Sequence, residues 1–484
     1  MEQFFANISS YIWSPAMIAL CLFAGLYFSF RTRFVQVRRF KTMAKLLFAK
    51  DKESKTGITS FQAFAMALSG RVGTGNIVGV ATAIGYGGPG SIVWMWIIAF
   101  LGSGTAFAES TLAQIYKEEH NGQFRGGPSY YIEKGLKCKW LAVLFAVCSV
   151  IGMGLLMPPL QCNGIAISCS NTFGIKPFVA GIIVAVLIGL VIIGGVKRIA
   201  NVAQIVAPFM AFLYIILSII VLICNANIVP GVFMDMIRSA FGFNEALGGI
   251  LGSTIAWGVK RGIYSNEAGQ GSGAIVAGAA KVSHPVKQGL VQGFSVYVDT
   301  LLVCSATALM ILACKTYNVY DASGNILIAS QNMQMGTPDV SYTSAALGTI
   351  LGVRWGNVVI AFALFFFAFT TIMAYYYYAE TNLVYLFSRK SSKKSVEKTL
   401  IGILRLCMVA SVFLGSLYEA KTMWDLGDIG VGTMAWINII AILLLSSKPI
   451  KALRDFEKQE KEGKEPKFNP KELGIENADF WENR

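Results

Sequence analysis

Charged residues are scarce in this sequence, at 14% of its 484 residues, where soluble proteins carry about 25%. Hydrophobic residues make up 55% of the chain, and the mean hydropathy is +0.57. A water-exposed surface cannot be built from so few charges, so most of the chain must face lipid or other buried helices. The composition therefore predicts a polytopic membrane protein and excludes disordered, collagen-like and disulfide-scaffold proteins.

Histidine is nearly absent, with only His120 and His284, both in expected loops. The nine cysteines form no Cys-x-x-Cys pair, and most lie inside apolar runs, where cysteine behaves as a small hydrophobic residue. A histidine-based metal site or a Ser-His-Asp triad therefore has almost nothing to be built from. We expect a protein that is not an enzyme and that carries no cofactor.

Apolar segments long enough to cross about 30 Å of hydrocarbon recur along the chain, without the period-two alternation of a transmembrane barrel. Strands are therefore not expected, and about eleven transmembrane helices are. The segments lie at 14–30, 60–84, 91–115, 140–170, 178–195, 201–224, 246–280, 288–313, 346–387, 399–417 and 425–446.

The basic residues predict the orientation of these helices. With an external N-terminus, the cytoplasmic segments hold 32 of the 41 lysines and arginines, and the external segments hold five. This bias follows the positive-inside rule, so we expect a multi-pass protein of the cell (plasma or inner) membrane with its C-terminus in the cytoplasm. The same residues lie between apolar runs and form no basic groove, so nucleic acid is not an expected partner despite the net charge of +14.

Two of the segments contain residues that interrupt a helix. In 60–84, the stretch 69–79 holds four glycines and an asparagine, and each interior glycine costs about 1 kcal/mol relative to alanine. This stretch is either a close helix–helix contact through small residues or a discontinuous helix. In 246–280, the stretch 258–272 combines glycines with ionisable residues, which are functional candidates within a span. The alternative there is a loop between two shorter spans. It would make the number of spans even and place the basic C-terminal tail outside, against the positive-inside rule.

The two interrupted segments occupy matching places in the predicted topology. Five spans begin with each of them, and the first set starts in the cytoplasm whereas the second starts outside. Inverted five-helix repeats with broken first helices are typical of secondary transporters. We therefore expect an extra N-terminal helix with a basic loop (1–59), two five-helix inverted repeats (60–245 and 246–447) and a solvated cytoplasmic tail (448–484).

Such a centre suits a zwitterion. Half-helix N-termini attract a carboxylate, and half-helix C-termini and freed carbonyls attract an ammonium group or Na⁺. Gly73 and Gly75 would let the backbone approach closely, and Asn76 and Asn266 would add side-chain hydrogen bonds. The pocket should therefore be small.

At these residues the sequence resembles the sodium:alanine (alanine/glycine:cation) symporter family. The motifs that carry the resemblance are Gly70-Arg71-Val72-Gly73-Thr74-Gly75-Asn76-Ile77, Gly87-Gly88-Pro89-Gly90 with Trp94-Met95-Trp96, Tyr264-Ser265-Asn266-Glu267-Ala268-Gly269, Ser283-His284-Pro285, Phe369-Thr370-Thr371-Ile372 and Phe468-Asn469-Pro470. The resemblance implies an all-α, leucine-transporter-type fold. It also implies Na⁺-coupled symport (uptake) of small neutral amino acids such as alanine or glycine across the bilayer, by alternating access.

The resemblance, together with the residues themselves, also selects site residues. Seven are expected to contact the substrate: Gly73, Thr74, Gly75, Asn76, Gln161, Trp257 and Asn266. Four are expected to hold Na⁺ through carbonyl or hydroxyl oxygens, which suit a hard cation: Ser69, Val72, Thr370 and Thr371. Without the resemblance the two threonines would be helix-packing hydroxyls, and Trp257 is equally well explained by interfacial packing.

Ionisable residues within or near the spans are expected to pair among themselves: Arg71, Glu109, Lys260, Arg261, Glu267, Asp299 and Glu380. Arg71 and Glu267 are the candidates for a gate or an ion pair beside the breaks.

One departure from the family pattern leaves the substrate open. Many members continue the Asn-Glu-Ala-Gly motif with Ala-Pro and His-Ala, whereas this chain has Gly273-Ala274-Ile275-Val276. A Na⁺- or H⁺-coupled transporter of glutamine or serine is therefore one alternative. An amino-acid-binding sensor on the same fold is another, although the short tail offers no signalling domain.

Overall fold

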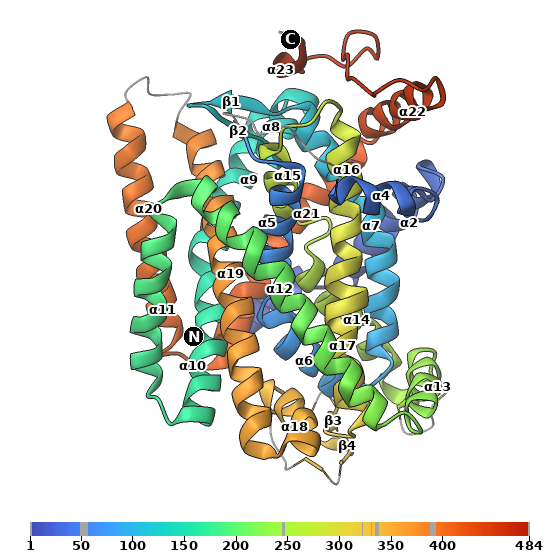
Figure 1. The fold of residues 1–484 in the computed structure, drawn as a ribbon, viewed down its shortest axis with the longest axis vertical. Helices are drawn as coiled ribbons and strands as arrows, with labels where there is room; N and C mark the ends of the chain where they lie inside the picture. The colour runs from blue at the N-terminus through green and yellow to red at the C-terminus, as the bar shows by residue number, and fades with distance from the viewer. Residues whose placement is uncertain are drawn as a thin grey trace.

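Long helices packed side by side form the body of the molecule (Figure 1). The computed structural model describes residues 2–48, 57–243, 247–321, 323–330, 332–333, 338–387 and 394–482. Within them, eight helical stretches are long and apolar enough to cross a membrane. The described residues of each of the eleven predicted segments are mostly helical, so the predicted helical membrane architecture is confirmed.

The elements up to residue 243 hold the first interrupted segment, which is divided into α5, a short π-helix η1 and α6. They are α1 (Glu2–Ile12), α2 (Pro15–Arg31), α3 (Val35–Arg38), α4 (Phe40–Leu47), α5 (Ser60–Arg71), η1 (Gly75–Gly79), α6 (Val80–Gly87), α7 (Ser91–Ile115), β1 (Glu118–His120), β2 (Gln123–Arg125), α8 (Pro128–Leu136), α9 (Lys139–Ile151), η2 (Gly152–Leu156), α10 (Met157–Phe173), α11 (Pro177–Ile192), α12 (Gly195–Cys224) and α13 (Val229–Ala240). A capping box starts α5, in which Thr59 and Gln62 exchange side-chain and main-chain hydrogen bonds of 3.0 and 3.1 Å.

The remaining elements hold the second interrupted segment, which is divided into α14 and α15. They are η3 (Gly248–Ile250), α14 (Leu251–Asn266), α15 (Ser272–Ala279), α16 (Pro285–Val296), η4 (Tyr297–Cys304), α17 (Ser305–Ala313), β3 (Val319–Tyr320), β4 (Ile326–Ile328), α18 (Val340–Leu351), α19 (Val353–Phe387), α20 (Lys394–Gly415), α21 (Ala420–Leu444), α22 (Ser447–Lys461) and α23 (Asp479–Glu482).

Two segments are divided differently from the prediction. The second break covers five residues, 267–271, so the predicted break at 258–272 is wrong over its first nine residues, which are helical. The predicted single span 346–387 is two helices, because Gly352 at φ 82° ends α18 before α19 begins.

Two small antiparallel hairpins, which were not expected, lie outside the long helices. In β1–β2, Glu118 pairs with Arg125, and in β3–β4, Val319 pairs with Ile328. In Figure 1 they lie at opposite ends of the helical body. They are connections between helices and leave the helical core unchanged.

The C-terminal segment is docked on the body, so the prediction of a solvated tail is wrong. Phe456, Phe468 and Trp481 are buried, and the Trp481 indole donates to the carbonyl of Gln114 at the end of α7 (2.8 Å). Three aromatic rings, from Phe124, Phe480 and Trp481, surround the ammonium group of Lys117 at 4.7–5.1 Å. The apolar residues spaced along this charged segment supply the contact surface.

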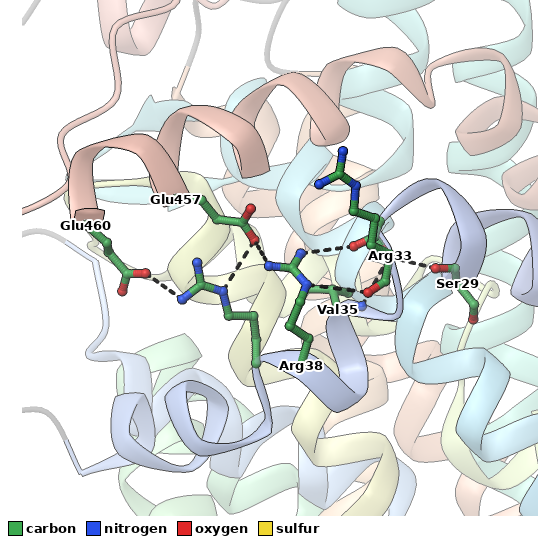
Figure 2. Close-up of polar contacts among 8 residues, drawn as sticks. Ser29, Arg33, Val35, Arg38, Glu457 and Glu460 are labelled. Carbon is green, nitrogen blue, oxygen red and sulfur yellow. Dashed lines mark hydrogen bonds and ion pairs between the residues drawn. The ribbon is translucent and has the colours of Figure 1, made fainter. Parts of the chain in front are cut away.

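Ion pairs hold α22 against the C-terminal end of α3. Figure 2 shows Arg38 reaching Glu457, at 2.5 Å, with Glu460 further along α22. Arg39 pairs with Glu460 at 2.7 Å. The basic residues that predicted a cytoplasmic loop therefore also bind the acidic face of the tail helix.

Candidate substrate and cation site

The first break releases main-chain N–H groups, and two side chains accept hydrogen bonds from them. Gly73 N donates to Asn76 Oδ1 (2.8 Å), and Thr74 N donates to Gln161 Oε1 of α10 (2.9 Å). Asn76 N donates to the carbonyl of Gly73 (3.1 Å). In a regular α-helix each N–H would bond the carbonyl four residues earlier, so the helix is interrupted where the sequence predicted.

The same break releases carbonyl groups. The N–H groups that would bond the carbonyls of Ser69 and Val72 in a helix are those of Gly73 and Asn76, which bond elsewhere. Both carbonyl oxygens instead lie near the hydroxyl oxygen of Thr371 on α19, at 2.8 and 3.2 Å.

The Thr371 hydroxyl also lies 2.9 Å from the carbonyl of Phe367, one turn earlier on α19. We call these four oxygens, from Ser69, Val72, Phe367 and Thr371, the Thr371 oxygen cluster. One hydroxyl hydrogen cannot serve three acceptors, so lone pairs converge on a fully buried point. Such a set of oxygens suits a hard cation.

Thr370, the other predicted hydroxyl ligand, makes no hydrogen bond to the carbonyls of Ser69 or Val72 among the described residues. Its hydroxyl bonds the carbonyls of Phe366 and Phe367 in its own helix, at 3.0 and 3.1 Å. Thr370 therefore reaches the cluster only at the Phe367 carbonyl, which it shares with Thr371.

A buried carboxylate joins the two interrupted segments. Asp299 Oδ1 accepts from Asn76 Nδ2 (2.7 Å), and Asp299 Oδ2 accepts from the hydroxyls of Ser265 (2.9 Å) and Thr300 (2.7 Å). Asp299 lies in η4, a π-helical stretch of the kind found at functional sites. Sequence reasoning named Asp299 only as an ion-pairing group and passed over Ser265. An acidic residue within a span was the available signal.

The second break is supported by side chains of neighbouring helices. Asn438 of α21 donates to the carbonyl of Gly269 (2.9 Å), and Gly271 N donates to Glu109 of α7 (3.2 Å). Asn266, a predicted substrate contact, accepts at Oδ1 from Ala268 N (3.0 Å), so this oxygen caps its own turn. The break is therefore held from α7 and α21.

A cavity of about 440 Å³ leads from Thr74 toward the predicted external ends of the helices, where Asp339 and Lys421 line it. Trp257 forms part of its wall and stacks on Tyr86 with ring centroids 5.0 Å apart, away from the break itself. On the same wall, Asp428 of α21 pairs with two residues of α14, Lys260 (2.6 Å) and Arg261 (3.0 Å).

Arg71 and Glu267, the two candidates for a gate or an ion pair, contact neutral partners among the described residues. Arg71 donates to the hydroxyl of Ser295, and no carboxylate oxygen among the described residues lies within 4.0 Å of its guanidinium. Glu267 instead accepts from the Tyr378 hydroxyl (3.2 Å). Their neighbours on other helices decide these contacts, and a single sequence does not contain that information.

Two broken helices that meet at a buried polar centre, within a bundle of long helices, define a secondary transporter of the leucine-transporter type. The chain is structurally similar to a Na⁺-coupled sialic acid symporter in a substrate-bound outward-open state, with a TM-score of 0.52 and 12% identity over 97% of this chain and 96% of that one. This likeness concerns the fold.

The chain belongs to the sodium:alanine symporter family, whose profile matches residues 1–470. It is 53% identical, over 100% of its length and 98% of the relative, to a Bacillus subtilis (strain 168) protein, YrbD, named as a candidate sodium/proton-dependent alanine carrier. A sodium/proton-dependent alanine carrier of Bacillus sp. (strain PS3) is 48% identical, over 89% of this chain and 95% of its own length. The sodium/alanine symporter AgcS of Methanococcus maripaludis is 35% identical, over 93% and 96%.

Proposed function

We propose that the protein takes up a small neutral amino acid, with alanine the leading substrate, by Na⁺-coupled symport. The family and the names of its relatives support the substrate class and the ion. The observation that carries the proposal is the Thr371 oxygen cluster, where carbonyls released by the first break meet a hydroxyl of α19. Na⁺ would bind these oxygens and tie α5 to α19.

The substrate carboxylate would bind the N–H groups of Gly73 and Thr74. These groups begin the helical stretch η1–α6, whose N-terminal end carries partial positive charge. The oxygens of Asn76 and Gln161 hold the two donors, and the carboxylate would replace one or both of them. Little room exists here, because a Cβ at Gly73 would lie 2.5 Å from Thr371 Oγ1 and 2.9 Å from Gln161 Oε1. This supports a small substrate.

Asp299 would supply the negative charge at the cationic end of the site. It is the carboxylate that Asn76 joins to the first break and Ser265 joins to the second. A buried carboxylate needs a counter-charge, which the substrate ammonium group or a coupling cation would bring. Asp299 therefore extends the predicted set of site residues.

Alternating access would then use the two inverted repeats, 60–245 and 246–447, with the N-terminus outside. The cavity from Thr74 would be the external entrance, with the Lys260–Arg261–Asp428 group on its wall. The docked tail would cover the cytoplasmic side. Occupancy by Na⁺ and substrate would favour one state over the other by differential affinity, without an enzymatic step.

Uptake into proteoliposomes tests the proposal. An inward Na⁺ gradient should drive radiolabelled alanine above its external concentration, and an equal K⁺ gradient should not. Competition by unlabelled alanine, glycine, serine and glutamine ranks the substrates, and strongest competition by glutamine would replace alanine in the proposal. Saturable binding without uptake would instead identify a sensor.

A further inference from the structure

Glu109, in the C-terminal third of α7, is a fully buried carboxylate that neither the Na⁺ site nor the substrate site uses. Its Oε2 atom accepts two hydrogen bonds, from Gly271 N (3.2 Å) and from Asn438 Nδ2 (2.8 Å). Its Oε1 atom has no hydrogen-bond partner among the described residues. A glutamate in a membrane segment with one oxygen unused requires an explanation.

No basic nitrogen of the described residues lies within 4.0 Å of this carboxylate, whereas Glu380 has Arg125 at 2.7 Å. The charged and titratable groups that interact with Glu109 are Arg71 from α5 and Tyr131 from α8. From α21 comes the neutral Asn438, whose Oδ1 accepts from the Tyr131 hydroxyl. Glu109 is therefore a buried acid without an ion-pair partner.

We propose that Glu109 binds a proton that crosses the membrane together with Na⁺ and the amino acid, an inference that rests on the proposed symport function. A buried carboxylate without a paired cation is strongly disfavoured, and proton uptake removes the unpaired charge. The free Oε1 atom takes the proton from external water. Oε2 keeps both of its hydrogen bonds, because a neutral carboxyl group still accepts through its other oxygen.

The contacts of Glu109 couple this proton to movement. Gly271 caps the N-terminus of α15, and Asn438 also holds the carbonyl of Gly269, so Glu109 and Asn438 together tie the second break to α7 and α21. Hydrogen bonds to an ionised carboxylate are roughly twice as strong as those to a neutral group. Protonation therefore loosens α15 from α7, which permits opening toward the cytoplasm, where Oε1 releases the proton to water.

The test measures alanine accumulation in proteoliposomes at a fixed inward Na⁺ gradient, with and without an inward proton gradient of one pH unit. One proton per amino acid multiplies the final accumulation ratio of the wild-type protein by about ten, since one pH unit is worth about 1.36 kcal/mol. In the Glu109→Gln variant, the proton gradient should leave the accumulation ratio unchanged. A pH-sensitive dye inside the vesicles should report alanine-dependent acidification with the wild type and none with Glu109→Gln.

Two control variants, Glu476→Gln and His284→Gln, should keep the tenfold response. Glu476 is an exposed acid of the tail, and His284 is a buried titratable group outside the spans. If Glu109→Gln does not insert, Glu109→Asp keeps a carboxyl group and should retain the response with a shifted pH midpoint.

The outcomes separate the two proposals. Absence of Na⁺-driven uptake in the wild type overturns the proposed function. Na⁺-driven uptake that ignores the proton gradient overturns the proton inference alone. A tenfold response that survives in Glu109→Gln, or an unshifted pH midpoint in Glu109→Asp, overturns the assignment to Glu109.

Discussion

Replacing Thr371 by valine tests the cation site most directly. Valine has nearly the same shape as threonine but carries a methyl group where the hydroxyl lies 2.8 Å from the Ser69 carbonyl and 3.2 Å from the Val72 carbonyl. The variant therefore removes one oxygen from the Thr371 oxygen cluster and leaves the two released carbonyls facing an apolar group. The backbone of α19 should be unchanged.

The magnitude follows from the lost oxygen. Leaving a buried polar group without a partner costs about 1–3 kcal/mol, and about 1.4 kcal/mol corresponds to a factor of ten in affinity. Thr371→Val should therefore raise the Na⁺ concentration for half-maximal alanine uptake by roughly 5- to 150-fold. Thr371→Ser, which keeps the hydroxyl, should restore most of the affinity.

Uptake in proteoliposomes as a function of Na⁺ concentration measures the effect, with size-exclusion chromatography to verify that each variant is folded. Thr370→Val is the matched neighbour, and it should change the half-maximal Na⁺ concentration by no more than about threefold, because back-bonding within a helix contributes little. An unchanged Na⁺ dependence in well-folded Thr371→Val, or equal losses at both threonines, would refute the assignment.

Three further changes have defined outcomes. Asp299→Asn should lower the apparent affinity for alanine by roughly 10- to 150-fold, because hydrogen bonds to a charged group are worth about 1.5–3 kcal/mol; competition uptake measures it. Gly73→Ala should abolish uptake without loss of expression, since its Cβ would meet Thr371 Oγ1 at 2.5 Å. Burial lowers the pKa of His284 below its usual value of 6.5, so the neutral imidazole contributes stability above that pH. This stability is lost as the pH falls through the folded-state pKa, and thermal unfolding of His284→Gln should show a weaker loss.

The position of the first break could be predicted, but that of the second could be predicted only in part. Around Gly73 and Gly75, glycine coincides with an asparagine that bonds the released N–H group, so the pattern and the cause agree. In the second segment, a Cβ at Gly258 or Gly262 would collide with α7, so these glycines serve close packing inside an intact helix. Gly269, at φ 87°, serves the break. The sequence alone therefore does not distinguish a glycine that serves close packing from one that serves a break.

The candidate site shows the same limit at Thr370 and Thr371. Both lie in α19, an apolar helix of 35 residues whose hydrophobic positions mark no single face. Which hydroxyl meets the first break depends on the rotation of α19 about its axis, and packing against α5, α10 and α12 sets that rotation. The pairing of Arg125 with Glu380 is equally non-local, since 255 residues separate them. Residue type could therefore be predicted at these positions, but not orientation.

The backbone groups released at the two breaks have different hydrogen-bond partners, and this difference suits the breaks to different roles. At the first break, carbonyls of Ser69 and Val72 share a single hydroxyl hydrogen, so a cation can bind there without displacing a strong hydrogen bond. At the second break, Glu109 and Asn438 already bond the released backbone groups. A change in these hydrogen bonds therefore requires a change in the charge of a side chain. A metal ion suits the first arrangement and a proton suits the second. Asp299, bonded to both segments through Asn76 and Ser265, provides the physical link by which one event can influence the other.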